Sequence, residues 1–158
     1  MDTLTQQALN WALTHIRRFG DTDILPGAFE FAAVAHAWTW LRIELESRDL
    51  AIYGLRPHRY LLVPKPGGGF RVVVQLDPLD TIVYTALVYE MAELIERHRI
   101  PAAQRVACSY RIQLDDKGSF FGPDNGWRDF HGRFGGRISG GVTSNMGGTI
   151  PFRRLVRL

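Results

Sequence analysis

Two cations flank a glycine-rich turn near the middle of the sequence. Lys65 follows an apolar run that starts at His58, and Arg71 opens a second run that ends at Gln75. Pro66 and three glycines lie between the two runs. A lysine supplies a mobile point charge and an arginine a two-pronged donor, a combination that suits a triphosphate. The pattern predicts a phosphate-binding hairpin, with two solvated turn residues as the alternative.

Two further pairs of side chains have types that could do chemistry. Tyr110 and Arg111 place an aromatic ring beside a cation, and such pairs can stack on bases and contact backbone phosphates. The alternative is a core tyrosine beside an exposed arginine. Asp77 and Asp80 resemble a carboxylate pair, but their place at a helix start favours capping over metal binding.

Motifs for metals and cofactors are not indicated. The five histidines and the single cysteine show no zinc-ligand spacing, and no Gly-Lys-Ser/Thr follows the glycine turn as a P-loop requires. We therefore predict no catalytic residue, no metal ligand and no cofactor in this chain.

The elements that would position these residues follow from hydrophobic periodicity and helix-end signals. A first helix is expected to have Thr3 as its N-cap and Gly20 as its stop. The other expected elements are a helix over 29–48, strands over 58–64 and 70–76, a helix from Asp77–Pro78, an extended segment over 105–112 and a turn over 115–118.

The helix that begins at Pro78 is expected to bury one apolar stripe. The stripe consists of Ile82, Val83, Ala86, Leu87, Met91, Leu94 and Ile95. Together the elements predict an α+β domain over 1–130, with helices packed on a small antiparallel sheet. The glycine- and arginine-rich segment 131–158 has little hydrophobic periodicity, and we expect it to be disordered or out of frame.

Composition indicates an ordinary globular protein. Hydrophobic residues make up 46% of the chain and charged residues 22%. No apolar run reaches the roughly 18 residues of a membrane span, and the first residues lack the basic start of a secretory signal. Cys108 is the only cysteine, which fits a reducing compartment. We therefore expect a cytoplasmic protein without a membrane partner. The net charge of +3 arises in the tail, where 128–158 hold six arginines and one acid, Asp129.

The order of several segments along the chain can be compared with that of a known family. A helical N-terminal region precedes VPKPGGGFRVVVQLDPLDTIVYTALVYEMAELIE, and RHRIPAAQRVACSYRI and GWRDF follow. Over roughly residues 8–130, this succession resembles the fingers region of bacterial reverse transcriptases, particularly the divergent kind grouped with phage-defence systems. By that resemblance, Lys65 and Arg71 correspond to the residues that hold the triphosphate of the incoming deoxynucleotide. Arg111, beside Tyr110, corresponds to a position along the RNA template.

The family's reaction adds deoxynucleotides to a 3′ end with two divalent metals, Mg²⁺ in the complete enzyme. The chain departs from the family after Trp127 and Phe130, where the family places its catalytic carboxylates, because the last carboxylate side chain here is Asp129. Two metals need several carboxylates. The resemblance therefore implies the N-terminal fragment of an RNA-directed DNA polymerase, which binds nucleotide and template but is inactive alone.

A separate chain that contains the palm is a candidate partner of such a fragment. Two alternatives remain open: a non-catalytic RNA-binding or protein-interaction module that works with a partner chain, and a helical interaction protein with no nucleic-acid role. Without a palm, the chain is expected to expose apolar surface and to self-associate.

Overall fold

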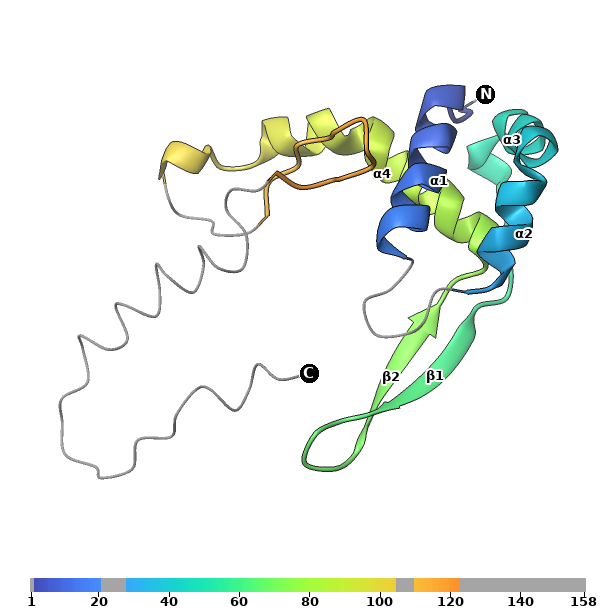
Figure 1. Cartoon of the computed structure of the whole chain (residues 1–158). Helices are drawn as coiled ribbons and strands as arrows, with labels where there is room; N and C mark the ends of the chain where they lie inside the picture. Colours follow the sequence, from blue (N-terminus) through green and yellow to red (C-terminus); the bar gives the residue numbers. More distant parts are fainter. Residues whose placement is uncertain (1, 21–27, 105–109, 123–158) are drawn as a thin grey trace.

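The computed structural model describes residues 2–20, 28–104 and 110–122 (Figure 1). These residues confirm the predicted α+β class, with four α-helices and one two-stranded antiparallel sheet. The elements are α1 (Gln6–Phe19), α2 (Glu30–His36), α3 (Trp38–Glu46), η1 (Leu50–Ile52), β1 (Arg59–Pro64), β2 (Phe70–Gln75), α4 (Pro78–His98) and η2 (Ala102–Gln104). The predicted tail 131–158 lies outside the described residues. So do residues 105–109 of the extended segment predicted over 105–112.

The core lies where α1 packs against α4, with α2 and α3 alongside (Figure 1). One face of α1 supplies the largest share of the apolar core cluster, as its apolar spacing predicts. The buried cluster consists of Leu4, Ala8, Leu9, Ala12, Leu13, Ile16, Phe31, Val34, Leu45, Ile82, Val83 and Ala86. Removing this apolar surface from water is the main source of the fold's stability.

The start of α1 differs from the prediction. Thr5, not Thr3, is the N-cap, and its Oγ1 accepts a hydrogen bond from the Ala8 N–H at 3.2 Å. Leu4 and Leu9 flank this cap and are 2% and 0% exposed. An apolar residue before the cap that packs near the fourth helical residue fixes where a helix begins. The predicted stop is confirmed: Gly20 has φ +81° and its N–H donates to the Ile16 carbonyl.

The helix predicted over 29–48 is two helices. The chain turns at Ala37, which has φ −92° and ψ 12°. The turn has a packing reason, because α2 contacts α4 while α3 contacts α1. One straight helix would not reach both neighbours. Periodicity over 29–48 indicates helical residues but does not report which neighbour each turn of helix packs against.

The first half of α4 follows the prediction, and the second half does not. Asp77 caps the helix and Pro78 occupies its first turn. Ile82, Val83 and Ala86 are buried, but Met91, Leu94 and Ile95 are exposed by 47%, 47% and 36%. The reason is that α4 continues past α1 (Figure 1), so its second half is not covered by α1.

No helix in the described ranges is long and apolar enough to cross a bilayer.

The segment 110–122 folds back onto α1. Its predicted turn over 115–118 is confirmed by a hydrogen bond from Gly118 N–H to the Asp115 carbonyl. The Trp11 indole N–H donates to the Asp115 carbonyl at 2.7 Å, and the His15 Nδ1–H donates to the Gly118 carbonyl at 2.7 Å. The Phe120 ring packs edge-on against the rings of Trp11 and His15.

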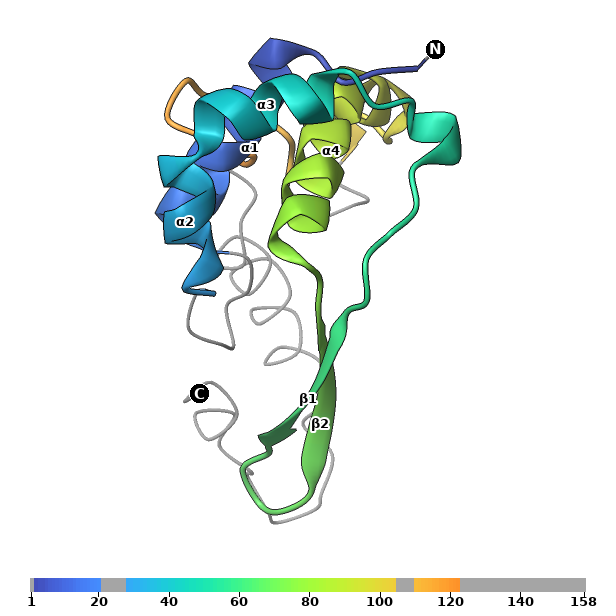
Figure 2. The ribbon, with the colours of Figure 1, turned by 90° about the vertical axis from the view of Figure 1, so that its right-hand side faces the viewer.

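The strands β1 and β2 form a hairpin that projects away from the helices (Figures 1 and 2). Both predicted strands are confirmed to within about one residue, the normal uncertainty of an element's end. In the register, Arg59 pairs with Gln75 at the base and Pro64 pairs with Phe70 beside the turn. The hairpin places the candidate phosphate-binding cations at its far end.

Candidate functional site

The tip of the hairpin is a tight turn built from glycines. Lys65 and Gly69 pair across it, with the Lys65 N–H donating to the Gly69 carbonyl at 3.0 Å. Gly67, Gly68 and Gly69 have φ of +85°, +100° and +81°. Residues with a Cβ adopt this backbone region only at a cost. A Cβ added at any of the three would have nothing within 4 Å, so the space around the turn is open to a ligand.

The register places Arg71 on one face of the hairpin, and extending the pairing by one step past the strand end places Lys65 on the same face. Val63 pairs directly with Arg71, so their side chains share a face. Lys65 is two residues beyond Val63 and continues the pairing opposite Gly69, and residues two apart in a strand point the same way. Both cations are exposed. The two charges are therefore presented together beside the open turn.

Most arginines in the described residues are paired with carboxylates, but these two cations are not. The paired ones are Arg18, Arg42, Arg48, Arg56, Arg59, Arg97, Arg99 and Arg111. Within the described ranges, neither Lys65 nor Arg71 has an ion-pair partner, and the same is true of Arg17 and Lys117 elsewhere on the fold. At the hairpin tip, two such cations lie on one face.

The same face is anchored at its base by an ion pair. The Arg59 Nη2 of β1 lies 2.5 Å from the Glu30 Oε1 of α2. The hydrogen bond from Arg59 is the main reason that the pKa of Glu30 lies below its usual value. This contact ties the start of β1 to the helical body, and so helps to set the direction in which the hairpin projects.

A second ion pair, with a buried carboxylate, lies where the chain enters and leaves the hairpin. Asp77 caps α4 as predicted, accepting the Leu79 N–H at 2.9 Å. Asp80 does more than the predicted capping: it is 1% exposed and accepts the Tyr53 hydroxyl at 2.6 Å and the Arg56 N–H and Nη1–H at 2.7 Å each. Its partners lie 24 and 27 residues earlier in the chain, a separation that no local motif reveals.

The second predicted pair, Tyr110 and Arg111, contacts the C-terminal end of α4, where Arg99 donates to the Tyr110 carbonyl at 2.6 Å. Arg111 is engaged internally: its Nη1 lies 3.3 Å from the Glu96 Oε2, and its Nη2 donates to the Ile100 carbonyl at 2.9 Å. Tyr110 is 48% exposed and its ring lies against Phe121 at 5.1 Å. The structure does not bring this pair together with Lys65 and Arg71.

Glu96 holds this second region together. Burial alone would raise the pKa of its carboxyl, but hydrogen bonds from the Ile112 N–H and from Arg99, with the charges of Arg99 and Arg111, bring the pKa below its usual value. To contact a template, the Arg111 guanidinium would therefore have to leave the ionised carboxylate of Glu96.

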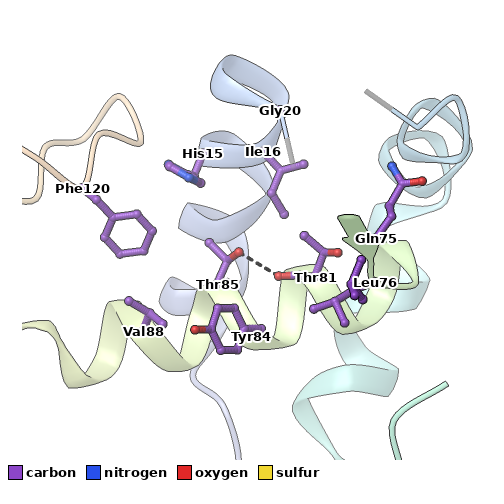
Figure 3. A pocket seen from close by; sticks show the side chains of 11 residues that line it. His15, Ile16, Gly20, Gln75, Leu76, Thr81, Tyr84, Thr85, Val88 and Phe120 are labelled. Carbon is purple, nitrogen blue, oxygen red and sulfur yellow. Dashed lines mark hydrogen bonds between the residues drawn. The ribbon is translucent and has the colours of Figure 1, made fainter. Parts of the chain in front are cut away.

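A pocket of about 360 Å³ lies at the base of the hairpin, between α1, the end of β2 and α4 (Figure 3). Its lining mixes apolar and polar side chains: His15, Ile16, Gly20, Val74, Gln75, Leu76, Thr81, Tyr84, Thr85, Val88 and Phe120. The Thr85 hydroxyl is used within α4, where it donates to the Thr81 carbonyl at 2.7 Å. The sequence did not indicate this pocket, because its lining comes from α1, the end of β2, α4 and the segment 110–122.

His15 should make stability depend on pH. Burial lowers the pKa of its ring below the ordinary value of 6.5. The unfolded chain therefore binds a proton near pH 6.5 that the folded chain accepts only at lower pH, so the free energy of unfolding falls as pH drops below about 6.5. Urea unfolding at pH 7.5 and 5.5 measures this fall.

The control for this prediction is His15→Gln, whose amide can still donate to the Gly118 carbonyl. The fall between the two pH values should be smaller in the variant than in the wild type. Glu30 and Glu96, whose pKa values lie below their usual 4.5, lose their stabilising effect only in more acidic solution. Equal falls in variant and wild type would contradict the assignment to His15.

In the described part of the chain, no three His, Cys, Asp or Glu side chains are arranged to hold a metal ion. Asp77 and Asp80 both lie against Arg56, at 3.8 Å and 2.7 Å, which leaves them unsuited to a divalent metal. These residues do not fit the metal pair that the reverse-transcriptase resemblance implies. The chain matches no known protein-family model, no curated protein and no solved structure. The resemblance rests on the ordered sequence motifs.

Proposed function

We propose that the hairpin binds the triphosphate of a deoxynucleotide through Lys65 and Arg71, in a module that resembles the fingers of a bacterial reverse transcriptase. The observation that carries this proposal is the pairing of two exposed cations, without carboxylate partners in the described residues, on one face beside an open glycine turn. Cations held in this way need to break no internal contact before they bind an anion.

The expected affinity is low. Hydrogen bonds to charged groups each contribute about 1.5–3 kcal/mol. Two such contacts give a total near that of a millimolar dissociation constant, about 4 kcal/mol. The chain offers no described metal cluster to add to this. Tight binding and nucleotide addition therefore require a partner chain that supplies the carboxylates, and the proposal contains no catalytic step for this chain alone.

An RNA template is the second ligand of the proposed module. Support for template binding comes from the exposed Tyr110 and Phe121 rings, 48% and 49% exposed, on which an unpaired base can stack. Arg111 supports it less, because its guanidinium is already bound to Glu96. In this proposal the protein works in the cytoplasm with RNA, deoxynucleotides and a palm-containing chain, and has no membrane partner.

The test compares cations of the same type at the tip and elsewhere. Lys65→Ala and Arg71→Ala should each weaken binding of a deoxynucleoside triphosphate at least about tenfold, because each removes a charge-assisted contact worth about 1.5–3 kcal/mol. Lys117→Ala and Arg17→Ala remove cations that likewise have no described ion-pair partner, and should change affinity less than twofold. Titration followed by NMR suits millimolar affinities.

The matching monophosphate supplies a second comparison. It should bind more weakly than the triphosphate to the wild type, and the difference should shrink in the Lys65→Ala, Arg71→Ala double variant. If all four single variants lose affinity equally, binding reflects net charge alone, and the assignment to the hairpin is wrong.

A further inference from the structure

The hairpin's other face is apolar and exposed. The register pairs Tyr60 with Val74, Leu62 with Val72, and Pro64 with Phe70, so these six side chains share the face opposite Lys65 and Arg71. We call them the apolar hairpin face. Five of them are exposed by 69% (Tyr60), 48% (Val74), 66% (Leu62), 63% (Val72) and 63% (Phe70). In the described residues, nothing covers this face.

The size of this face argues that it is covered in solution. Aromatic side chains have areas of about 200 Å², so Tyr60 and Phe70 alone expose roughly 250 Å². Adding the aliphatic residues brings the face to the few hundred Å² that monomers rarely leave open. A two-stranded sheet is also marginally stable unless its apolar face packs against something. An apolar partner surface is therefore expected.

The distribution of charge favours a second copy of this chain as the occupant. Arg59, Lys65 and Arg71 all lie on the opposite face, so two apolar hairpin faces can meet without bringing like charges together. An anionic lipid surface is a poorer match, because the cations that would bind its headgroups point away from this face.

The pocket at the hairpin base gives the second copy a place for its tip. Val74 belongs both to the apolar hairpin face and to the pocket lining. Six residues per strand make the hairpin about 20 Å long. If two hairpins pack face to face in opposite directions, Phe70 at one tip meets the pocket at the other base. A cavity of about 150 Å³ holds a benzene ring, and this pocket measures about 360 Å³.

We propose that the apolar hairpin face is an isologous interface between two copies of this chain, with Phe70 of each copy in the pocket at the base of the other. The arrangement has a two-fold axis near the central pair Leu62 and Val72, and both copies bury the same residues. It goes beyond nucleotide binding, since the cations of the proposed site remain on the outer faces of the pair.

Sedimentation velocity of the full chain tests the interface. The wild type should be dimeric at about 100 µM, and Phe70→Asp should weaken dimerisation at least about thirtyfold, as expected for an aromatic side chain that fills a pocket of the partner. Trp40→Asp is the matched control, because Trp40 is similarly exposed (67%) but lies on α3. It should weaken dimerisation less than about threefold. A monomeric wild type, or equal effects of the two variants, overturns the proposal.

Disulfide trapping tests the geometry without relying on a variant that disrupts the face. In a Cys108→Ser background, Val72→Cys lies near the proposed two-fold axis and should form an intermolecular disulfide on oxidation. Arg71→Cys is its neighbour on the opposite face and should not. Equal cross-linking of the two overturns the proposal. The Lys65→Ala, Arg71→Ala double variant should stay dimeric, so loss of nucleotide binding and loss of the dimer are distinguishable.

Discussion

Asp80→Ala is expected to lower the free energy of unfolding by about 3 kcal/mol, because breaking a buried ion pair leaves its partners without a charge to bind. The carboxylate is 1% exposed and accepts three hydrogen bonds, from the Tyr53 hydroxyl, the Arg56 backbone N–H and the Arg56 guanidinium. All three donors would lose their acceptor at once. Urea unfolding followed by circular dichroism measures the change.

The expected value lies at the lower end of the range for buried pairs, about 3–5 kcal/mol. The Arg56 side chain is 29% exposed and regains part of its hydration when the carboxylate is removed. The backbone N–H of Arg56 is the donor that suffers most, because a main-chain group cannot move to water without moving the chain. A loss of this size is a large share of the roughly 5–15 kcal/mol that stabilises a typical domain.

Glu93→Ala is the control for Asp80→Ala. Glu93 is paired with Arg97 one helical turn on, and both side chains are largely exposed. Exposed pairs of this kind contribute about 0.3–0.5 kcal/mol. Both substitutions remove a carboxylate from α4, so they differ mainly in burial. Similar losses in the two variants would contradict the view that the Asp80 network stabilises the fold.

Gly118→Ala is expected to cost about 3 kcal/mol and to loosen the segment 110–122 from α1. Gly118 has φ +84°, which costs a residue with a Cβ roughly 1–2 kcal/mol. The added Cβ would also lie 2.8 Å from the His15 backbone nitrogen and 3.0 Å from its Cα. Overpacking against a rigid helix adds typically about 1–3 kcal/mol. The two costs act together because they arise from the same atom.

Gly68→Ala separates these two costs. Gly68 has φ +100°, but a Cβ there would have nothing within 4 Å. Its loss should be about 1–2 kcal/mol, from backbone strain alone. Hydrogen exchange of the Trp11 indole N–H, which donates to the Asp115 carbonyl, reports directly on the docking of the segment. If Gly118→Ala loses no more stability than Gly68→Ala, the close approach to α1 is not tight.

The sequence predicted best those elements whose signals are local. Apolar runs of strand-favouring residues on either side of a glycine turn predicted β1 and β2, and Asp77 with Pro78 predicted the start of α4. The break at Ala37 was not predicted, because it serves contacts of α2 and α3 with different helices. Apolar spacing along α4 likewise did not indicate that Met91 and its neighbours are uncovered.

In the candidate site, too, features with a local sequence signal were predicted and features that depend on distant contacts were not. The residue types at 65 and 71 were sufficient to predict a phosphate-binding hairpin, and nucleotide binding there stays a prediction. The residues that surround this hairpin could not be predicted. The ion pair between Arg59 and Glu30, the buried carboxylate of Asp80 and the pocket at the base all join residues that are far apart in the chain. Such contacts depend on the fold, and spacing along one strand does not contain them.

The projecting hairpin acts as a lever whose pivot is its base. With a length of about 20 Å, a rotation of about 10° at the base displaces the tip by roughly 3–4 Å. That displacement is about as long as a hydrogen bond itself. A substitution at Arg59, Glu30 or Asp80 that rotates the hairpin by this much would move both cations out of reach of the phosphate chain in the proposed site. In the proposed nucleotide site, substitutions at this pivot should alter the affinity although none of the three residues is part of that site.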